Sequence, residues 1–274
     1  MSTELEPCFK YAVLISYLGG SFSGWQRQPG LTSVQETIEK AVAQLTGEST
    51  SVVGSGRTDA GVHALGQVAH FVLRKKNWDP SIVQRGLNGI LPKTIQIIEA
   101  QRVALEFHAQ RSALKKQYSY YFQQGPTALP SLEPYSWWIR KSLDLAAMTE
   151  GLEILRGEHD FKAFQASGSK PGSTVRTILE AQVIYEPSQN FLPIHQVGMV
   201  RVRIVGTGFL KQMVRGIAGT LLQVGEGRRS PQCFQSILDS KDRGQVGPTA
   251  PPRALWLEQV WYPDAFQLWQ KPVP

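Results

Sequence analysis

The stretch FKYAVLISYL, residues 9–18, carries aromatic and branched apolar side chains at every second position: Phe9, Tyr11, Val13, Ile15 and Tyr17. Alternate residues of an extended chain point to the same side, so this spacing predicts a strand with one apolar face. A glycine-rich turn follows at residues 19–24. This strand is the first of an ordered series of elements that indicates the fold.

Helical and extended patterns alternate over the next hundred residues. Ser33, with Glu36 three residues later, predicts a capped helix that ends at Gly47. A second helix begins at Asp79-Pro80, and its apolar residues are expected to be buried: Ile82, Val83, Leu87 and Ile90. Short strands are predicted over residues 50–53, 67–73 and 94–103. The resulting β-α-β-β-α-β order is typical of a ferredoxin-like unit, an antiparallel sheet with both helices on one face.

The second half of the chain repeats this order of elements with insertions. The predicted strands cover residues 117–123, 174–185, 199–205 and 255–262, and the predicted helices cover residues 143–155, 209–224 and 233–238. We therefore predict an α+β fold of two ferredoxin-like (RRM-like) units, residues 1–108 and 109–274. We expect their antiparallel sheets to join and to leave a central catalytic cleft.

Composition sets limits on the class of protein. The 274 residues include 29 Lys plus Arg and 22 Asp plus Glu, a net charge of +7, with 42% hydrophobic residues. This is globular composition, and the basic excess is compatible with a polyanionic partner. We find no apolar run long enough to cross a membrane and no secretory signal at the N-terminus. The two distant cysteines, Cys8 and Cys233, favour a reducing, cytoplasmic location.

Familiar catalytic and cofactor motifs are missing from the sequence. It contains no phosphate-binding G-x-x-x-x-G-K-[ST], no dinucleotide G-x-G-x-x-G, no H-E-x-x-H and no G-x-S-x-G. The five histidines form no metal-ligand spacing with a cysteine. We therefore predict no metal and no cofactor.

The segment GSGRTDAGVHALG, residues 54–66, connects two predicted strands. Its four glycines allow sharp turns and close approach of a ligand to the backbone, and Arg57 and Asp59 lie inside it. From the residues alone, the simpler interpretation is a turn in which Asp59 bonds its own backbone.

The string Gly56-Arg-Thr-Asp-Ala-Gly-Val-His63 resembles the signature of the TruA family of tRNA pseudouridine synthases. Further blocks follow in family order over about residues 9–263: Gly24-Trp-Gln-Arg-Gln28, Ser33-Val-Gln35, Phe107-His-Ala109, Tyr118-Ser-Tyr120, Phe161-Lys-Ala-Phe164, Met213-Val-Arg215 and Leu255-Trp-Leu257.

The resemblance implies an enzyme that isomerises uridine to pseudouridine at positions 38, 39 and 40 of the tRNA anticodon stem-loop. Asp59 would be the catalytic residue, acting as nucleophile or assisting base detachment and proton removal, and the sequence leaves both routes open. The reaction needs no cofactor and no small-molecule cosubstrate. Family members are homodimers, so a homodimer is expected here.

The same resemblance assigns substrate-binding roles to four residues. Arg215 would pair with the catalytic carboxylate, although its helical position alone would equally suit a surface arginine. Tyr118 would stack on the target base and Leu255 would line the uracil pocket. Arg57 would fill the space that the extruded base leaves, or hold the RNA backbone.

Basic residues near these blocks are candidate contacts to RNA phosphates: Arg27, Arg111, Lys115, Lys116 and Lys211. Where the family usually has Arg after Phe107-His-Ala109, this chain has Gln110 and then Arg111, so either could take that contact.

Two other functions compete with the synthase. A non-catalytic RNA-binding module would have the same fold pattern and basic charge. An RNA methyltransferase would need a glycine-rich cofactor motif, and we find none.

Overall fold

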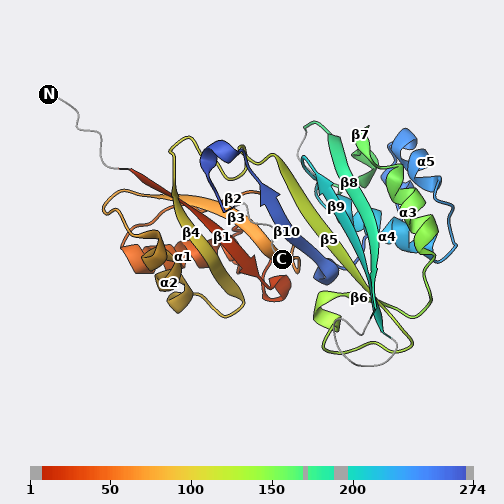
Figure 1. The fold of residues 1–274 in the computed structure, drawn as a ribbon, viewed down its shortest axis with the longest axis horizontal. Coiled ribbons are helices and arrows are strands. Elements are labelled where there is room, and N and C mark those ends of the chain that lie inside the picture. The colour runs from red at the N-terminus through yellow and green to blue at the C-terminus, as the bar shows by residue number, and fades with distance from the viewer. Residues whose placement is uncertain (1–7, 169–171, 188–196, 270–274) are drawn as a thin grey trace. The chain divides into compact units, whose positions relative to one another are not determined.

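A computed structural model describes residues 8–168, 172–187 and 197–269 (Figure 1). The chain divides into two compact units, Met1–Leu114 together with Leu257–Pro274, and Lys115–Trp256. The compact units and the predicted halves thus differ, since the C-terminal segment belongs with the first unit. The domain assignment at residues 108 and 109, with the roles given to each half, stays a prediction, as does the joining of the sheets.

The first unit follows the predicted order of elements: β1 (Phe9–Tyr17), α1 (Val34–Thr46), β2 (Val53–Gly54), β3 (His63–Leu73), α2 (Pro80–Ile90) and β4 (Ile95–Val103). β1 lies between β4 and β3, and β2 pairs with β3, all antiparallel. β10 (Leu255–Trp261) is the other neighbour of β3. The strand predicted over residues 50–53 is thus shorter and later than expected, and β3 begins at His63.

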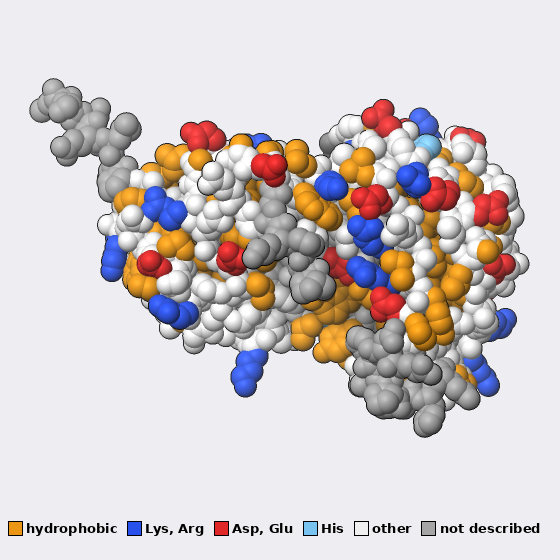
Figure 2. All heavy atoms as spheres, viewed as in Figure 1, with side chains coloured by type: hydrophobic (Ala, Val, Ile, Leu, Met, Phe, Trp, Pro, Cys, Tyr) orange, Lys and Arg blue, Asp and Glu red, His pale blue; other side chains and the backbone are white. Residues whose placement is uncertain are grey.

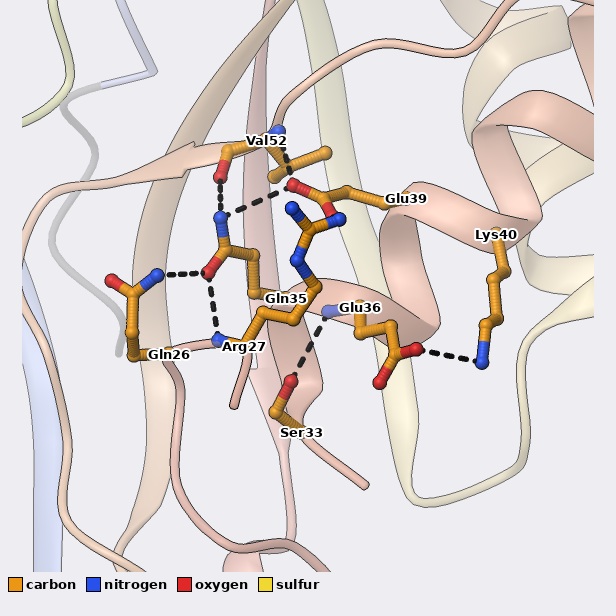
Figure 3. Close-up of polar contacts among 8 residues, drawn as sticks. All are labelled: Gln26, Arg27, Ser33, Gln35, Glu36, Glu39, Lys40 and Val52. Atoms are coloured by element: carbon orange, nitrogen blue, oxygen red, sulfur yellow. Dashed lines mark hydrogen bonds and ion pairs between the residues drawn. The ribbon is translucent and has the colours of Figure 1, made fainter. Parts of the chain in front are cut away.

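The strand predicted at residues 9–17 is confirmed as β1, and four of the five residues of its predicted apolar face are buried, whereas Phe9 is half-buried and Ala12 on the other face is also buried. Tyr11, Val13 and Ile15 are completely buried and Tyr17 is 2% exposed. α1 begins as predicted, since the Ser33 hydroxyl accepts a hydrogen bond from the Glu36 amide at 3.3 Å (Figure 3).

The two ends of α1 differ in how closely they follow the prediction. The Glu36 carboxylate pairs with Lys40 at 2.8 Å instead of completing a reciprocal capping box. Gly47 ends the helix with a φ of 70°, as its left-handed preference predicts.

The start of α2 is as predicted, but part of its predicted buried face is wrong. Asp79 caps the helix by accepting from the Ser81 amide at 2.8 Å. Val83 and Leu87 are buried, but Ile82 is 44% exposed, so its predicted burial is wrong. One residue step turns a helix by about 100°, so the face that buries Val83 and Leu87 leaves Ile82 outside it.

The described part of the second unit has the following strands and α-helices: β5 (Lys115–Gln124), β6 (Trp137–Ile139), α3 (Leu145–Glu153), β7 (Gly157–Asp160), β8 (Val175–Glu186), β9 (Gly198–Gly206), α4 (Met213–Gly225) and α5 (Cys233–Ser240). Its strands follow the order β5-β9-β8-β7, all antiparallel, and β6 pairs with β5 in parallel. The mixed α+β class is confirmed. Among helices of the described residues, none is long and apolar enough to span a membrane.

The helix predicted over residues 209–224 begins later, at Met213. Gln212, the residue before it, has a φ of 62°, a left-handed conformation that cannot continue into an α-helix. Phe209 therefore lies in the turn between β9 and α4 rather than on the helix.

Two histidines connect β3 with the chain after β4. His70 is 7% exposed, and its Nδ1 accepts from the Ala109 amide at 3.1 Å. Its ring centroid lies 4.8 Å from that of His108, whose Nδ1 accepts from the Gln110 and Arg111 amides, each at 3.2 Å. Burial, and then the charges of His108, Lys10 and Arg111, lower the pKa of His70 to about 4.

We expect His70 to make stability depend on pH. Its pKa is lower in the folded than in the unfolded chain, so the unfolded chain binds the proton first. The stabilisation is complete above pH 6.5 and is lost as the pH falls toward 4. Allowing for partial solvent access, the loss is about 2 kcal/mol. Urea unfolding at pH 7.5 and 4.5 measures it.

His70→Asn is the matched comparison, because Asn Oδ1 can replace Nδ1 as acceptor and does not titrate. The variant should lose less free energy of unfolding between the two pH values than the wild type. Equal losses in both proteins would show that His70 does not carry the effect.

Candidate active site

The Asp59 loop, residues 54–66, leaves β2 and enters β3 with both arms held by buried polar groups. The Ser55 amide donates to the Val68 carbonyl at 2.7 Å. The Gln67 side chain spans the loop, since its Nε2 donates to the Gly56 carbonyl at 2.9 Å and its Oε1 accepts from the Ser55 hydroxyl at 2.6 Å. These bonds fix the two ends of the loop relative to each other.

Thr58 connects the Asp59 loop to the turn after β1. Its hydroxyl shares a buried 2.8 Å hydrogen bond with the Tyr17 hydroxyl, and its carbonyl accepts from the Trp25 amide at 3.1 Å. Gly24 has a φ of 97°, and a Cβ there would lie 2.6 Å from the Thr58 carbonyl oxygen. The two backbones therefore approach more closely than any other residue at position 24 would allow.

Asp59 itself is half-buried, between the buried Thr58 and the exposed Ala60. Its main-chain carbonyl accepts from the Val62 amide at 3.1 Å, and Gly61 has a φ of 79°. A tight turn thus follows Asp59. The backbone just before Asp59 is held by the contacts of Thr58.

The turn after β1 is itself anchored on α1 (Figure 3). Gln35 Oε1 accepts from Gln26 Nε2 at 2.8 Å and from the Arg27 amide at 2.9 Å. Gln35 Nε2 donates to the Val52 carbonyl at 3.0 Å and to Glu39 Oε1 at 3.1 Å. The position of Thr58 is therefore determined by a network that reaches the helix.

Removing the Tyr17 hydroxyl tests this network. Burial raises the pKa of Tyr17 to about 12, so the hydroxyl keeps its proton at neutral pH. Tyr17→Phe should lower the free energy of unfolding by about 1 kcal/mol, because the buried Thr58 hydroxyl loses its partner. Exchange of the Trp25 amide should become faster. Tyr185→Phe is the control, because Tyr185 is 50% exposed, and it should change stability by less than about 0.5 kcal/mol. Equal effects of the two variants would contradict the account.

Tyr118 and Leu255 belong to the second unit. Tyr118 lies on β5 and is 7% exposed, and its ring meets that of Phe209 edge to face at a centroid distance of 5.1 Å. Leu255 begins β10 and is 6% exposed. The aromatic contact holds the Tyr118 ring in one orientation.

Arg215 also belongs to the second unit, on α4, and it is a fixed side chain rather than a surface arginine. It is half-buried, and its Nε donates to the Ala250 carbonyl at 2.7 Å. The Ala250 amide returns a bond to the Arg215 carbonyl at 3.1 Å. The 246–251 segment is thereby attached to α4.

Further contacts hold this 246–251 segment. The Gly247 amide donates to the Thr220 hydroxyl at 3.0 Å, and the Tyr120 hydroxyl donates to the Pro251 carbonyl at 3.0 Å. The segment that leads to Leu255 is therefore positioned by both α4 and β5.

The five candidate RNA contacts have different surroundings. Arg27, Arg111 and Lys211 are exposed, and Arg27 pairs with Glu39 at 3.3 Å. Lys115 and Lys116 are half-buried. Lys and Arg side chains lie among acidic ones on the visible face of the second unit (Figure 2).

Sequence reasoning did not single out Arg176, whose charge acts on Lys116. Burial, and then the charge of Arg176, lower the pKa of Lys116 to about 8. Arg176 occurs inside a stretch that reads as an ordinary strand, and no sequence signal links it to a residue sixty positions earlier.

The structure thus places a half-buried aspartate in a glycine-rich loop that is held on both sides, within an α+β chain. The sequence pattern of the family described as tRNA pseudouridine synthase matches residues 13–110 and 152–263. The chain therefore belongs to the tRNA pseudouridine synthase family. The matched ranges include Asp59, Arg215 and Leu255, whereas Tyr118 lies between them.

Curated relatives agree with this assignment. tRNA pseudouridine synthase A of Maridesulfovibrio salexigens is 41% identical over 91% of this chain and 89% of its own length. The Ralstonia nicotianae protein of the same name is 39% identical over 94% of this chain and 92% of its own. That of Chlamydia trachomatis is 38% identical over 94% of each chain.

Proposed function

We propose that this chain isomerises uridine to pseudouridine at positions 38, 39 and 40 of the tRNA anticodon stem-loop, with Asp59 as the catalytic residue. The observation that carries the proposal is the Asp59 loop, fixed through Thr58 and Gln67 in a member of the tRNA pseudouridine synthase family.

The reaction is an isomerisation, so the substrate supplies every atom of the product apart from exchanged protons. The bond from uracil N1 to ribose C1′ breaks, the uracil rotates, a bond from C5 to C1′ forms, and the C5 proton leaves as N1 gains one. No electrons are gained or lost and no group is donated. An aspartate can assist by covalent attack or by moving a proton at the ribose, and both routes suit a half-buried carboxylate.

Arg215 would pair with the Asp59 carboxylate and orient it, since a guanidinium donates strong charge-assisted hydrogen bonds to a carboxylate. The proposal requires the first and second units to present Asp59 and Arg215 to the same uridine. The bond from Arg215 to Ala250 supports it, because a fixed side chain loses little freedom when it meets its partner.

Tyr118, Leu255 and Arg57 would bind the extruded base and its surroundings. Stacking on an aromatic ring contributes about 1–3 kcal/mol per base, which offsets the cost of unstacking. The edge-to-face contact with Phe209 supports Tyr118 in this role. Arg57 is exposed on the Asp59 loop and could enter the vacated space.

Phosphate contacts from Arg27, Arg111, Lys115, Lys116 and Lys211 would position the stem-loop and make binding sensitive to salt. The exposed Arg111 side chain, rather than the uncharged Gln110, would take the contact that the family usually assigns to Arg.

We further propose that each unit has the ferredoxin-like plan, that the protein acts as a homodimer, and that it works in the cytoplasm with its tRNA substrate. The strand order β4-β1-β3 with β2 on β3, and the β-α-β-β-α-β order of the first unit, support the ferredoxin-like plan.

Sedimentation at micromolar concentration tests the dimer, and a monomer alone would contradict it.

The function is tested by incubating the protein with unmodified tRNA and mapping pseudouridine by carbodiimide-dependent primer extension. Stops one nucleotide 3′ of positions 38, 39 and 40 are expected wherever the tRNA has uridine at these positions. The second candidate, an RNA-binding module without catalysis, is favoured by the basic charge of +7. It would give salt-sensitive RNA binding with no stops.

A further inference from the structure

The turn that follows β9 contacts side chains from two other strands of the second unit. Tyr118 on β5 packs against Phe209 in this turn. A Cβ on Gly206 would lie 3.2 Å from the Phe209 ring, and one on Gly208 would lie 3.4 Å from Arg176 Cδ and Nε. The turn is therefore in contact with β5 on one side and with β8 on the other.

Lys116 lies at the same place by register. It is the β5 residue opposite Gly206 on β9, and Gly206 is in turn opposite Ile178 on β8. Gly206 itself has no side chain at this level, and the Phe209 ring lies over it. Lys116 and Tyr118 are two positions apart on one strand, so they share a face of the sheet.

Arg176 is oriented by its backbone contacts. Its Nη1 donates to the Ser173 carbonyl at 2.9 Å and to the Val175 carbonyl at 2.6 Å. Its bonds to the described residues use this nitrogen, so Nη2 and Nε can serve a ligand.

We propose that Lys116 and Arg176 together bind a phosphodiester of the RNA backbone directly beside the nucleotide whose base stacks on Tyr118. This inference rests on the proposed function, because it takes RNA as the ligand. It adds Arg176 as a substrate-binding residue and gives Lys116 a definite contact.

Charge explains why such a site would favour a phosphodiester. Two cations brought together and partly desolvated repel one another, and the charge of Arg176 contributes to lowering the pKa of Lys116 to about 8. A bound anion would remove this repulsion and would favour the protonated amine. Arg offers a planar pair of donors and Lys a point charge, a combination suited to phosphate oxygens. A nearby stacking tyrosine selects an anion that carries a base.

The test measures binding of an unmodified anticodon stem-loop RNA at several salt concentrations. Arg176→Gln and Lys116→Gln are compared with Arg140→Gln, which removes an exposed charge elsewhere in the second unit. Each site variant should weaken binding by about tenfold. The salt slope, which is the slope of log affinity against log salt concentration, should fall by roughly the amount that one phosphate contact contributes. Arg140→Gln should change affinity by less than about twofold. Thermal unfolding of each variant checks the fold. If Arg176→Gln unfolds, Arg176→Lys is measured in its place. This variant keeps the charge and should retain the wild-type salt slope.

A neutral methylphosphonate placed 5′ or 3′ of the target uridine identifies the contact. One of the two neutral linkages should weaken RNA binding by the wild-type protein. The same linkage should not weaken binding by Arg176→Gln any further. The inference is overturned if both linkages affect the two proteins equally, or if Arg176→Gln binds like Arg140→Gln. Wild-type protein that shows these binding effects but makes no pseudouridine would contradict the proposed function and leave the phosphate site standing.

Discussion

Replacing Asp59 by Asn is expected to abolish pseudouridine formation while the protein stays folded and continues to bind tRNA. The amide keeps the size of the side chain but can neither attack carbon nor accept a proton. Loss of a catalytic group of this kind typically lowers the rate by at least about 10³-fold. Single-turnover reactions with unmodified tRNA, followed by nucleoside analysis, measure the rate.

Two controls make the Asp59 result specific. Thermal unfolding should be almost unchanged, because the loop is held through Thr58 and Gln67 rather than by Asp59 alone. Binding of tRNA should be unchanged or slightly tighter, since the substitution removes a negative charge facing a polyanion. Wild-type turnover by the Asp59→Asn protein would show that another residue carries the chemistry.

Replacing Gly219 by Ala should cause the largest loss of stability. A Cβ at this position of α4 would lie 1.7 Å from the Pro248 carbonyl oxygen, so α4 and the 246–251 segment would have to separate. Helix propensity offsets only about 0.5–1 kcal/mol of the cost. We expect the free energy of unfolding to fall by about 3 kcal/mol, measured by urea unfolding. Activity should fall further than stability alone explains, because the same movement strains the bonds between Ala250 and Arg215.

Gly89→Ala is the matched control on another helix. Among the described residues, no heavy atom outside its own helix backbone and chain neighbours lies within 4 Å of a Cβ at Gly89. This variant should therefore be neutral or more stable by about 0.5–1 kcal/mol. If Gly219→Ala matched Gly89→Ala, the close packing of the 246–251 segment on α4 would be contradicted.

Local signals in the sequence predict much of the fold. The alternation in residues 9–18, the cap at Ser33 and the stop at Gly47 each act within a few residues, and the structure confirms them. β7 carries the sequence GEHD and has no apolar alternation, and β6 has only three residues, so neither has a local signal. The predicted start of α4 is wrong because Gln212 has a left-handed backbone conformation, which its residue type does not predict.

The candidate site, like the fold, has residues that the sequence predicts and residues that it does not. Asp59 stands out through the sequence around it, and the resemblance assigns Arg215 from its own block. The residues that position them are remote in sequence: Tyr17 bonds to Thr58, the residue before Asp59, and Ala250 bonds to Arg215. Single-sequence patterns report neighbours along the chain, and these pairs become neighbours only in the folded units.

The most direct test of the central claim uses tRNA that carries tritium at C5 of the uridine at position 39. Forming the bond from C5 to C1′ releases that hydrogen to water, so each turnover can be counted without added cofactor. We predict that wild-type protein releases one tritium per pseudouridine formed and that Asp59→Asn releases none. Absence of release by the wild type, or equal release by the variant, would contradict the account.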